Sequence, residues 1–308
     1  MKHFINLRDI PTKELKKIVL DAKKRKNLRK NSNTLDPDKD SPLKGKLLIQ
    51  MFEKTSLRTR LSFSIAIKQL GGGELTLRPD ELHLSKGGES LVDTAKIIST
   101  FGNAFMLRTD SEKKLDILKK HMTIPVINGL SPENHPTQIL SDVFTIEEIK
   151  KKSISKLQIC WIGDSNNVLN SLIEASVKFS FKLNIGCPKK YEPNKNLISW
   201  AKKNKGKIKI FNDSKKAASE SDVVFTDKVI SMNDKVNKAK KLKDFKKFQV
   251  NLDVMKKSKN ALFLHCLPRG PEVSDEVFLG KKSKVWQQAL NRVHVQKSIL
   301  LYCLEKLR

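Results

Sequence analysis

The stretch MFEKTSLRTRLSF, at residues 51–63, gathers groups suited to binding a phosphate. It follows an apolar run of strand length and leads into a helical pattern whose first turn carries Ser56, Arg58 and Thr59. A helix N-terminus offers free N–H groups and the positive end of its dipole. Hydroxyls add donors, and an arginine adds a charged, two-pronged clamp. The alternative is an ordinary helix start with a serine cap and surface arginines.

The choice of arginine supports the phosphate interpretation. Only ten of the 61 basic residues are arginines, so lysine is the default cation of this chain. Two arginines, Arg58 and Arg60, nevertheless occur within three positions. Because guanidinium is planar and forked where ammonium is a point charge, this local return to arginine indicates recognition of a planar or tetrahedral oxyanion.

Two further motifs carry groups that could act on a bound ligand. In ENHPTQ, His135 precedes Pro136, which suits the first position of a helix, and Gln138 follows within the first turn. In HCLPRG, Cys266 and Arg269 follow an apolar strand-like run. We expect both to point into a crevice, because open α/β sheets bind ligands at the carboxyl ends of their strands. The alternatives are a structural histidine and a buried cysteine that packs as a small apolar residue.

Polar residues also follow two other strand-like runs. GDSNN comes after 157–162, and DKVISM, which starts at Asp227, comes after 221–226. The single glycine of GDSNN does not make the G-x-G-x-x-G fingerprint, so dinucleotide binding is rejected. An asparagine amide and an aspartate at adjacent strand ends would suit the carboxylate and the ammonium of an amino acid.

The order of elements predicts an α/β protein with parallel sheets, because strand-length apolar runs alternate with helical patterns. The strand candidates are 46–52, 73–78, 104–109, 124–129, 157–162, 182–188, 207–211, 221–227 and 261–268. At 308 residues the chain has room for two domains of ordinary size. The helical pattern that begins at residue 136 is expected to leave the first domain, which places the boundary near residue 150.

Bulk composition excludes several function classes. The net charge is +28, but the lysines are scattered and aromatics make up only 6%, so no stacking platform for nucleic acid is expected. No apolar run approaches the roughly 20 residues of a membrane span, and no signal-peptide pattern is seen. Four cysteines lie far apart without a Cys-x-x-Cys pair, which favours a reducing cytoplasm.

In combination, SLRTR, HPTQ, GDSNN, DKVISM and HCLPR occur in an order that closely resembles the ornithine carbamoyltransferases, within the aspartate/ornithine carbamoyltransferase superfamily. The resemblance covers nearly the whole chain, including ESLVDTAKI and ALNRVHVQKSILLYCL. It implies two similar-sized domains, each a parallel sheet flanked by helices, linked by crossing helices, with the active site in the interdomain cleft. The carbamoyl-phosphate-binding domain would be 1–150 joined by the helix at about 286–308, and the ornithine-binding domain would be 151–285.

The resemblance implies transfer of the carbamoyl group of carbamoyl phosphate to the side-chain amine of L-ornithine, giving L-citrulline and phosphate. The expected setting is arginine metabolism in the biosynthetic direction. No metal or organic cofactor is expected, because carbamoyl phosphate is already activated. Expected partners are the two substrates and other copies of the chain in a homotrimer, with no nucleic acid and no membrane. The loop 83–90 resembles one that reaches a neighbouring subunit's site, with Lys86 a lesser candidate.

Carried over position by position, the resemblance assigns the site residues. For carbamoyl phosphate they are Ser56, Leu57 (through its backbone N–H), Arg58, Thr59, His83, Arg108, His135, Gln138, Cys266, Leu267 and Arg292. For ornithine they are Asn167, Asp227, Ser231 and Met232. The catalytic members are Arg58, Arg108, His135, Asp227 and Cys266. Arg60 is expected to be structural.

Three positions depart from the family pattern. Leu57 replaces a threonine and loses its hydroxyl, Asn233 replaces a glycine, and Leu290 replaces the glutamate of AENR. None of the three departures removes a primary ligand. A carbamoyltransferase for acetylornithine, succinylornithine or putrescine is the alternative function, although Asp227 favours a free α-amino group. The aspartate enzyme has a proline where Cys266 lies. A polyanion-binding protein is the alternative from a different class.

Overall fold

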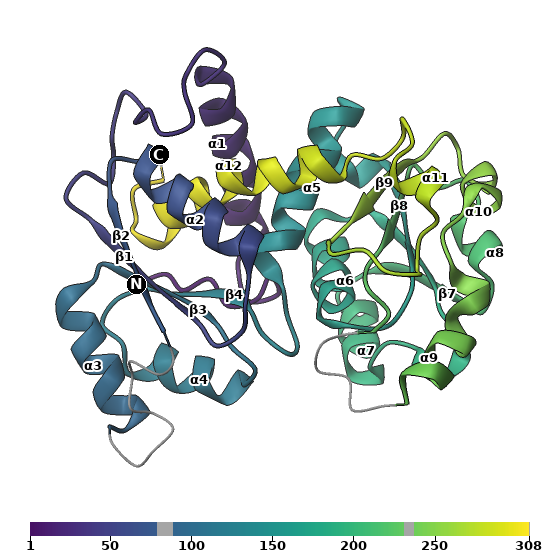
Figure 1. The fold of residues 1–308 in the computed structure, drawn as a ribbon, viewed down its shortest axis with the longest axis horizontal. Helices are drawn as coiled ribbons and strands as arrows, with labels where there is room; N and C mark the ends of the chain where they lie inside the picture. Colours follow the sequence, from purple (N-terminus) through teal and green to yellow (C-terminus); the bar gives the residue numbers. More distant parts are fainter. Residues whose placement is uncertain (79–88, 231–236, 308) are drawn as a thin grey trace. The chain divides into compact units, whose positions relative to one another are not determined.

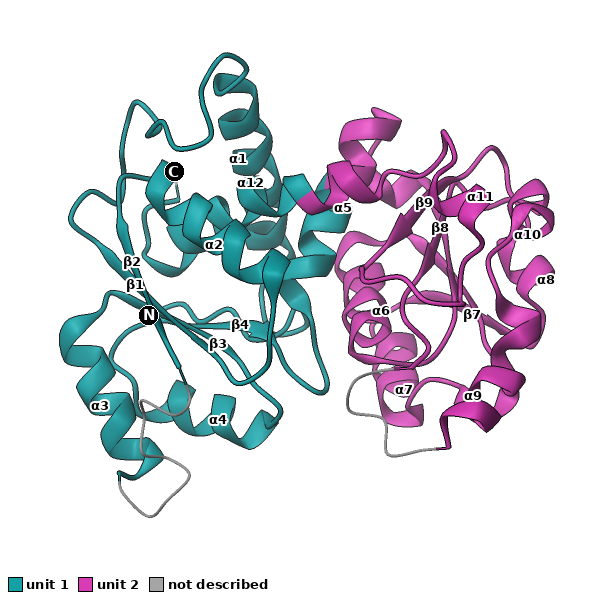
Figure 2. Ribbon diagram, viewed as in Figure 1, with its two compact units in different colours: residues 1–144, 290–308 teal, residues 145–289 magenta. Residues whose placement is uncertain are grey.

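The computed structural model describes residues 1–78, 89–230 and 237–307. The chain forms two compact units, Met1–Phe144 with Leu290–Arg308, and Thr145–Ala289 (Figure 2). Each unit contains one parallel sheet with helices on both faces (Figure 1), which confirms the predicted α/β class. No described helix is both long and apolar enough to cross a lipid bilayer.

The first unit is built on a four-stranded sheet with the order β2-β1-β3-β4. Its strands are β1 (Leu47–Phe52), β2 (Gly73–Leu77), β3 (Ala104–Arg108) and β4 (Val126–Leu130). Its helices are α1 (Thr12–Leu28), α2 (Leu57–Gln69), α3 (Leu91–Phe101) and α4 (Glu112–His121). The unit boundaries fall within α5 (Pro136–Lys150) and α12 (Val285–Cys303).

The two central strands of the first unit, β1 and β3, are mostly apolar and buried, as expected for parallel strands covered by helices on both faces. On one face Ile49 and Met51 of β1 and Leu107 of β3 pack with Ile98 of α3 and Leu118 of α4. Figure 1 shows α3 and α4 on this side of the sheet and α1 and α2 on the other. The sheet therefore holds the ends of β1 and β3 rigidly, and these ends lead into the candidate phosphate-binding turns.

Helix α12 is anchored in the first unit by a buried ion cluster. The fully buried Lys297 ammonium donates to both carboxylate oxygens of Asp38 at 3.0 Å. Arg25 and Arg29 bind the same carboxylate at 3.0 and 2.9 Å. Burial lowers the pKa of Lys297 to about 8, although Asp38 opposes that change. One carboxylate thus joins helices α1 and α12.

The second unit has a five-stranded parallel sheet with the order β7-β6-β5-β8-β9. Its strands are β5 (Gln158–Ile162), β6 (Lys182–Gly186), β7 (Lys207–Phe211), β8 (Val223–Thr226) and β9 (Leu262–His265). Its further helices are α6 (Asn167–Phe179), α7 (Lys195–Lys203), α8 (Ser214–Ala218), α9 (Lys238–Phe245), α10 (Leu252–Lys257) and α11 (Asp275–Phe278). Single 3₁₀ turns lie at Ile154–Lys156, Lys189–Tyr191 and Lys246–Phe248.

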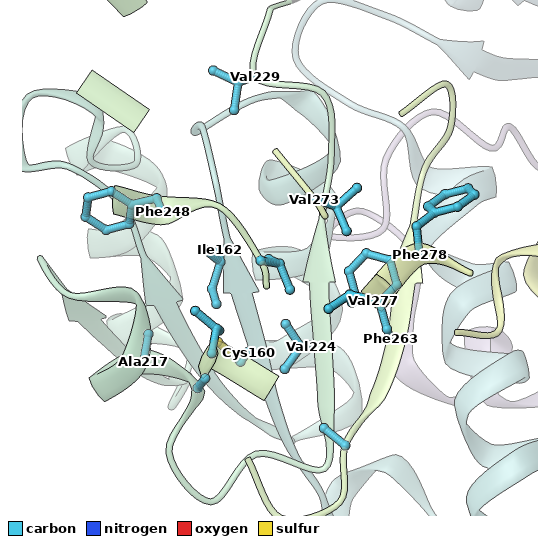
Figure 3. Close-up of a cluster of buried hydrophobic side chains, with 14 of the residues drawn as sticks. Cys160, Ile162, Ala217, Val224, Val229, Phe248, Phe263, Val273, Val277 and Phe278 are labelled. Carbon is cyan, nitrogen blue, oxygen red and sulfur yellow. The ribbon is translucent and has the colours of Figure 1, made fainter. Parts of the chain in front are cut away.

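One core cluster of the second unit packs against this sheet. Figure 3 shows Cys160 of β5, Val224 of β8 and Phe263 of β9 in this cluster, with Val277 and Phe278 of α11 beside them. Cys160 is fully buried, and burial raises the pKa of its thiol far above the ordinary value. This cysteine packs as a small apolar side chain.

Candidate active site

Both sheets place the candidate residues where the strand order reverses. In the first unit the chain moves from β1 outward to β2 and then returns to the other side of β1 with β3. In the second it moves from β5 outward through β6 and β7 and then returns beside β5 with β8. At such a reversal the connections leaving two neighbouring strands diverge, which opens a crevice at their carboxyl ends.

In the first unit the turn after β1 and the end of β3 converge. Ser56 is the N-cap of α2 in an extended conformation, but its side chain makes no capping hydrogen bond. Its hydroxyl instead accepts a hydrogen bond from Arg108 Nη1 at 3.1 Å. A plain helix cap would use the hydroxyl within the helix, so this geometry favours the anion-binding interpretation of SLRTR.

The first turn of α2 is open toward solvent. Leu57, its first residue, is 72% exposed, Arg58 is half-buried and Arg60 is exposed. The first N–H groups of a helix have no partner inside the helix. Leu57 has no side-chain hydroxyl, so only its backbone could take part in binding here, and this role stays a prediction.

Arg292 joins the starts of two helices from the interior of the unit. This arginine of α12 is only 1% exposed. Its Nη2 donates to Thr59 Oγ1 at 2.8 Å, and its Nη1 donates to Gln138 Oε1 at 2.7 Å. The Gln138 amide in turn donates to Asp142 Oδ1 at 2.8 Å. The fork of Arg292 thus fixes Thr59 at the start of α2 against Gln138 at the start of α5.

His135 is held neutral beside these arginines. It is 2% exposed and directly precedes Pro136, the first residue of α5. Burial is the largest cause that holds its pKa well below the ordinary value, followed by the positive charges of Arg292, Arg108 and Arg58. A neutral imidazole still carries one N–H donor, so His135 can polarise a carbonyl oxygen without adding a charge.

In the second unit Asn166 and Asp227 connect the ends of β5 and β8. Asn166 is the N-cap of α6, and its Oδ1 accepts from the backbone N–H groups of Val168 and Leu169. Its Nδ2 donates to Asp227 Oδ2 at 2.8 Å. Asn167, selected from the sequence, is the first residue of α6. Sequence reasoning therefore missed Asn166, although asparagine's preference for N-caps was an available signal.

The Asp227 carboxyl group has an unusually high pKa. Burial raises its pKa to about 6, and the nearby Glu272 charge acts in the same direction. His265 and the hydrogen bonds from Asn166 and the Lys228 backbone oppose this shift only in part. Asp227 is therefore a carboxylate at neutral pH whose charge is poorly solvated. Such a group binds a cation favourably, because the cation replaces the missing solvation.

The turn after β9 is organised by Glu272. Its Oε1 lies 2.9 Å from His265 Nε2 and accepts from the Gly270 backbone at 2.5 Å. Cys266 and Leu267, between these two residues, are partly buried. The structure thus fixes the backbone that carries both candidate residues.

Arg269 does not act as predicted. We expected it to point into the crevice, but its Nη1 donates to Asp275 Oδ1 at 2.6 Å and its guanidinium lies 4.4 Å from the centre of the Phe278 ring. Stacking and ion pairing on α11 hold this arginine in a structural contact.

Several sequence-predicted residues cannot be placed. His83, Lys86, Ser231, Met232 and Asn233 lie outside the described residues. Among the residues that are described, no group of three or more His, Cys, Asp or Glu side chains could hold a metal ion.

Comparisons with known proteins assign each half of the chain. Residues 2–148 match the carbamoyl-P binding domain of aspartate/ornithine carbamoyltransferase, and residues 155–303 match the Asp/Orn binding domain. The chain is 40% identical over 306 residues to an ornithine carbamoyltransferase of Agrobacterium fabrum, covering 98% of each sequence. It is 42% identical over 308 residues to that of Brucella abortus, covering 99% of this chain and 96% of the relative.

Solved structures agree with these sequence matches. The ornithine carbamoyltransferase of Pyrococcus furiosus superposes with a TM-score of 0.90 at 38% identity, over 97% of this chain and 96% of that one. The anabolic ornithine carbamoyltransferase of Campylobacter jejuni superposes with a TM-score of 0.87 at 36% identity, over 98% and 99% of the two chains. Because both halves match in sequence and the complete chain matches in structure, the chain belongs to the aspartate/ornithine carbamoyltransferase family.

Proposed function

We propose that the protein is an ornithine carbamoyltransferase, which transfers the carbamoyl group of carbamoyl phosphate to the side-chain amine of L-ornithine. The observation that carries the proposal is identity of 40–42% to enzymes of that name over almost the full chain. The convergence of the SLRTR turn with Arg108 and His135 supports it, because that arrangement suits an oxyanion-bearing substrate.

We assign carbamoyl phosphate to the first unit. Ser56, the Leu57 backbone, Arg58, Thr59 and Arg108 would hold the phosphate. The carbamoyl group would meet His135 and Gln138, with Arg292 fixing their surroundings and Cys266 and Leu267 contributing from the turn after β9. His83 belongs to the same proposal. The observed fork of Arg292 onto Thr59 and Gln138 supports a shared role for these side chains.

We assign ornithine to the second unit. Asp227 would bind the α-ammonium group, and Asn167, Ser231 and Met232 would complete the site. The poorly solvated carboxylate of Asp227 supports this role, because its pKa near 6 leaves it charged at neutral pH and in need of a cation.

The proposed chemistry is a nucleophilic substitution at the carbamoyl carbon. The side-chain amine of ornithine has a solution pKa of about 10.4, so the site must bind or generate its neutral form. The amine nitrogen attacks the carbonyl carbon, and the charge that develops on the oxygen is stabilised by Arg58, Arg108 and neutral His135. The C–O bond to phosphate then breaks, and the phosphate takes the proton released by the amine.

Assembly, cellular location and pathway are further proposals. We infer a homotrimer from the resemblance of the loop 83–90 to one that reaches a neighbouring subunit's site. A cytoplasmic location is supported by four free cysteines, three of them buried. The biosynthetic direction, toward arginine, is supported by likeness to the anabolic Campylobacter enzyme.

A substrate comparison tests the function directly. The purified protein, supplied with carbamoyl phosphate, should form a ureido product fastest with L-ornithine when tested beside acetylornithine, succinylornithine, putrescine and aspartate. A faster reaction with an acylated ornithine or with putrescine would replace the assignment with a related carbamoyltransferase. Salt-sensitive nucleic-acid binding without any ureido product would indicate the polyanion-binding alternative instead.

Asp227→Asn is expected to weaken ornithine binding while it raises stability at neutral pH. The amide cannot neutralise an ammonium, so the KM for ornithine should rise by about 30-fold or more, with little change for carbamoyl phosphate. The pKa of Asp227 is raised to about 6 in the folded protein. At a pH above the pKa of the unfolded chain, ionisation of this carboxyl group therefore costs the folded wild type stability. The variant avoids this cost and can still accept the Asn166 hydrogen bond.

The pH dependence distinguishes this explanation from a general packing change. The variant's stability advantage should be full at pH 7.5, above the folded pKa, and should shrink as the pH falls through 6 toward 4, where the wild-type carboxyl is protonated. Thermal midpoints of both proteins across that range provide the measurement. An advantage independent of pH, or an effect mainly on carbamoyl phosphate, would contradict the assignment.

A further inference from the structure

Glu53 belongs to none of the motifs assigned to the site, yet its backbone and side chain bond to Arg108 and the turn that follows it. We propose that it is a positioning residue of the carbamoyl-phosphate site, which fastens the turn after β1 to the turn after β3. The inference rests on the proposed function, because it deepens the account of that same site.

Four hydrogen bonds join Glu53 to residues 108–114. The Glu53 backbone N–H donates to the Arg108 carbonyl at 2.9 Å. The carboxylate Oε2 accepts from Thr109 Oγ1 at 2.6 Å and from the Asp110 backbone N–H at 3.3 Å. Oε1 accepts from the Lys114 ammonium at 2.5 Å. Both carboxylate oxygens of Glu53 are thus bonded, Oε2 to the turn after β3 and Oε1 to Lys114 of α4.

The connection extends to rigid elements on both sides. The Glu53 side chain is 10% exposed, and Thr109 is 1% exposed. The Thr109 hydroxyl also accepts from the backbone N–H of Ser111, the N-cap of α4, and the Thr109 backbone donates to the Leu130 carbonyl of β4. Glu53 is therefore fixed against the start of α4, where the helix dipole also favours a carboxylate.

This position controls the two groups that meet at the phosphate site. Ser56 lies three residues after Glu53, and Arg108 directly precedes Thr109. The two side chains meet at 3.1 Å, so a shift of either turn would separate them. An unpaired carboxylate so close would repel a dianion, but the Lys114 ammonium balances the Glu53 charge. Glu53 can thus hold the geometry without opposing the ligand.

Three variants remove different subsets of the Glu53 contacts. Glu53→Ala removes them all except the backbone bond, and Glu53→Gln keeps an acceptor oxygen but loses the ion pair. Thr109→Val removes one hydroxyl with little change of shape. The measurements are kcat, the KM for each substrate, the thermal midpoint, and the Kd of inorganic phosphate by calorimetry. Lys113→Met is the matched control, because it removes an exposed cation from the same turn of α4 and leaves the Lys114, Thr109 and Asp110 bonds of Glu53 in place.

The expected result is a selective loss. Glu53→Ala should raise the KM for carbamoyl phosphate and the Kd of phosphate by about tenfold or more, since small misplacements at a site are costly. Thr109→Val and Glu53→Gln should each raise both values by about three- to tenfold. Lys113→Met should stay within about threefold, and the KM for ornithine should change by less than about twofold in every variant.

Two results would overturn the proposal. One is phosphate binding within about twofold of wild type in both Glu53→Ala and Thr109→Val. The other is an equal loss for both substrates that follows the thermal midpoint, which would indicate a structural role alone. If Glu53→Ala does not fold, Thr109→Val decides. If the wild type forms no citrulline, the proposed function fails, whereas the phosphate titrations still decide the role of Glu53.

Discussion

Arg58→Ala is expected to raise the KM for carbamoyl phosphate by about 100-fold and to lower kcat by about 100-fold or more. The guanidinium lies in the first turn of α2, where it adds a permanent charge to the N–H groups of the helix start. It would bind the phosphate in the ground state and stabilise the charge that grows on phosphate as the C–O bond breaks. Loss of both interactions should therefore affect binding and rate together.

Two companion variants define the origin of this effect. Arg58→Lys keeps a charge but loses the fork, so its KM and kcat should lie between those of wild type and Arg58→Ala. Lys68→Ala removes one exposed cation from the far end of the same helix and should leave both constants unchanged. Steady-state kinetics with varied carbamoyl phosphate give the answer. If the KM of Arg58→Ala for carbamoyl phosphate stayed within a few-fold of wild type, Arg58 would not be a phosphate-binding residue.

Arg292→Met is expected to damage both stability and catalysis. The buried guanidinium donates to Thr59 and Gln138, and methionine fills much of the same space without a donor. Two hydrogen bonds to a charged group would be lost and the buried Gln138 oxygen would lose a donor, so the free energy of unfolding should fall by about 2–4 kcal/mol. The activity should fall by about 100-fold, because the starts of α2 and α5 would no longer be held together.

Chemical denaturation and steady-state assays measure the two effects of Arg292→Met separately. Leu290→Ala, two residues earlier in α12, is the matched control, because Leu290 is 59% exposed. Its free energy of unfolding should remain within about 0.5 kcal/mol of the wild-type value. An Arg292→Met protein that unfolds at the wild-type denaturant concentration and retains its activity would show that the fork is dispensable.

The strands could be predicted from the sequence because their apolar runs are short, continuous and bounded by polar turns. The fourth strand shows where such reasoning loses precision: we predicted 124–129, but β4 is Val126–Leu130. Pro125 has no N–H to donate, although its carbonyl accepts from Phe105, so ladder pairing begins at the following residue. The proline is visible in the sequence, and its missing N–H accounts for the later start of the strand.

The candidate site was predictable as motifs but not as contacts. SLRTR and His135 are recognisable locally, since each accompanies the start of a helix. The bond between Ser56 and Arg108 joins positions 52 residues apart, and the bond between Arg292 and Gln138 joins positions 154 apart. Local periodicity does not encode such pairings, because they depend on strand order. Glu53 went unnoticed for the same reason: its partners lie beyond the next two strands in sequence.

The ion pair between Lys297 and Asp38 has a consequence for biosynthesis of the chain. Residues 290–308 belong to the first unit, yet the ribosome makes them only after all of Thr145–Ala289. Until then, Asp38 has no Lys297, and Thr59 and Gln138 have no Arg292. The unit that emerges first from the ribosome is therefore completed last. A nascent chain cannot form the complete candidate phosphate-binding site before its second unit has been translated.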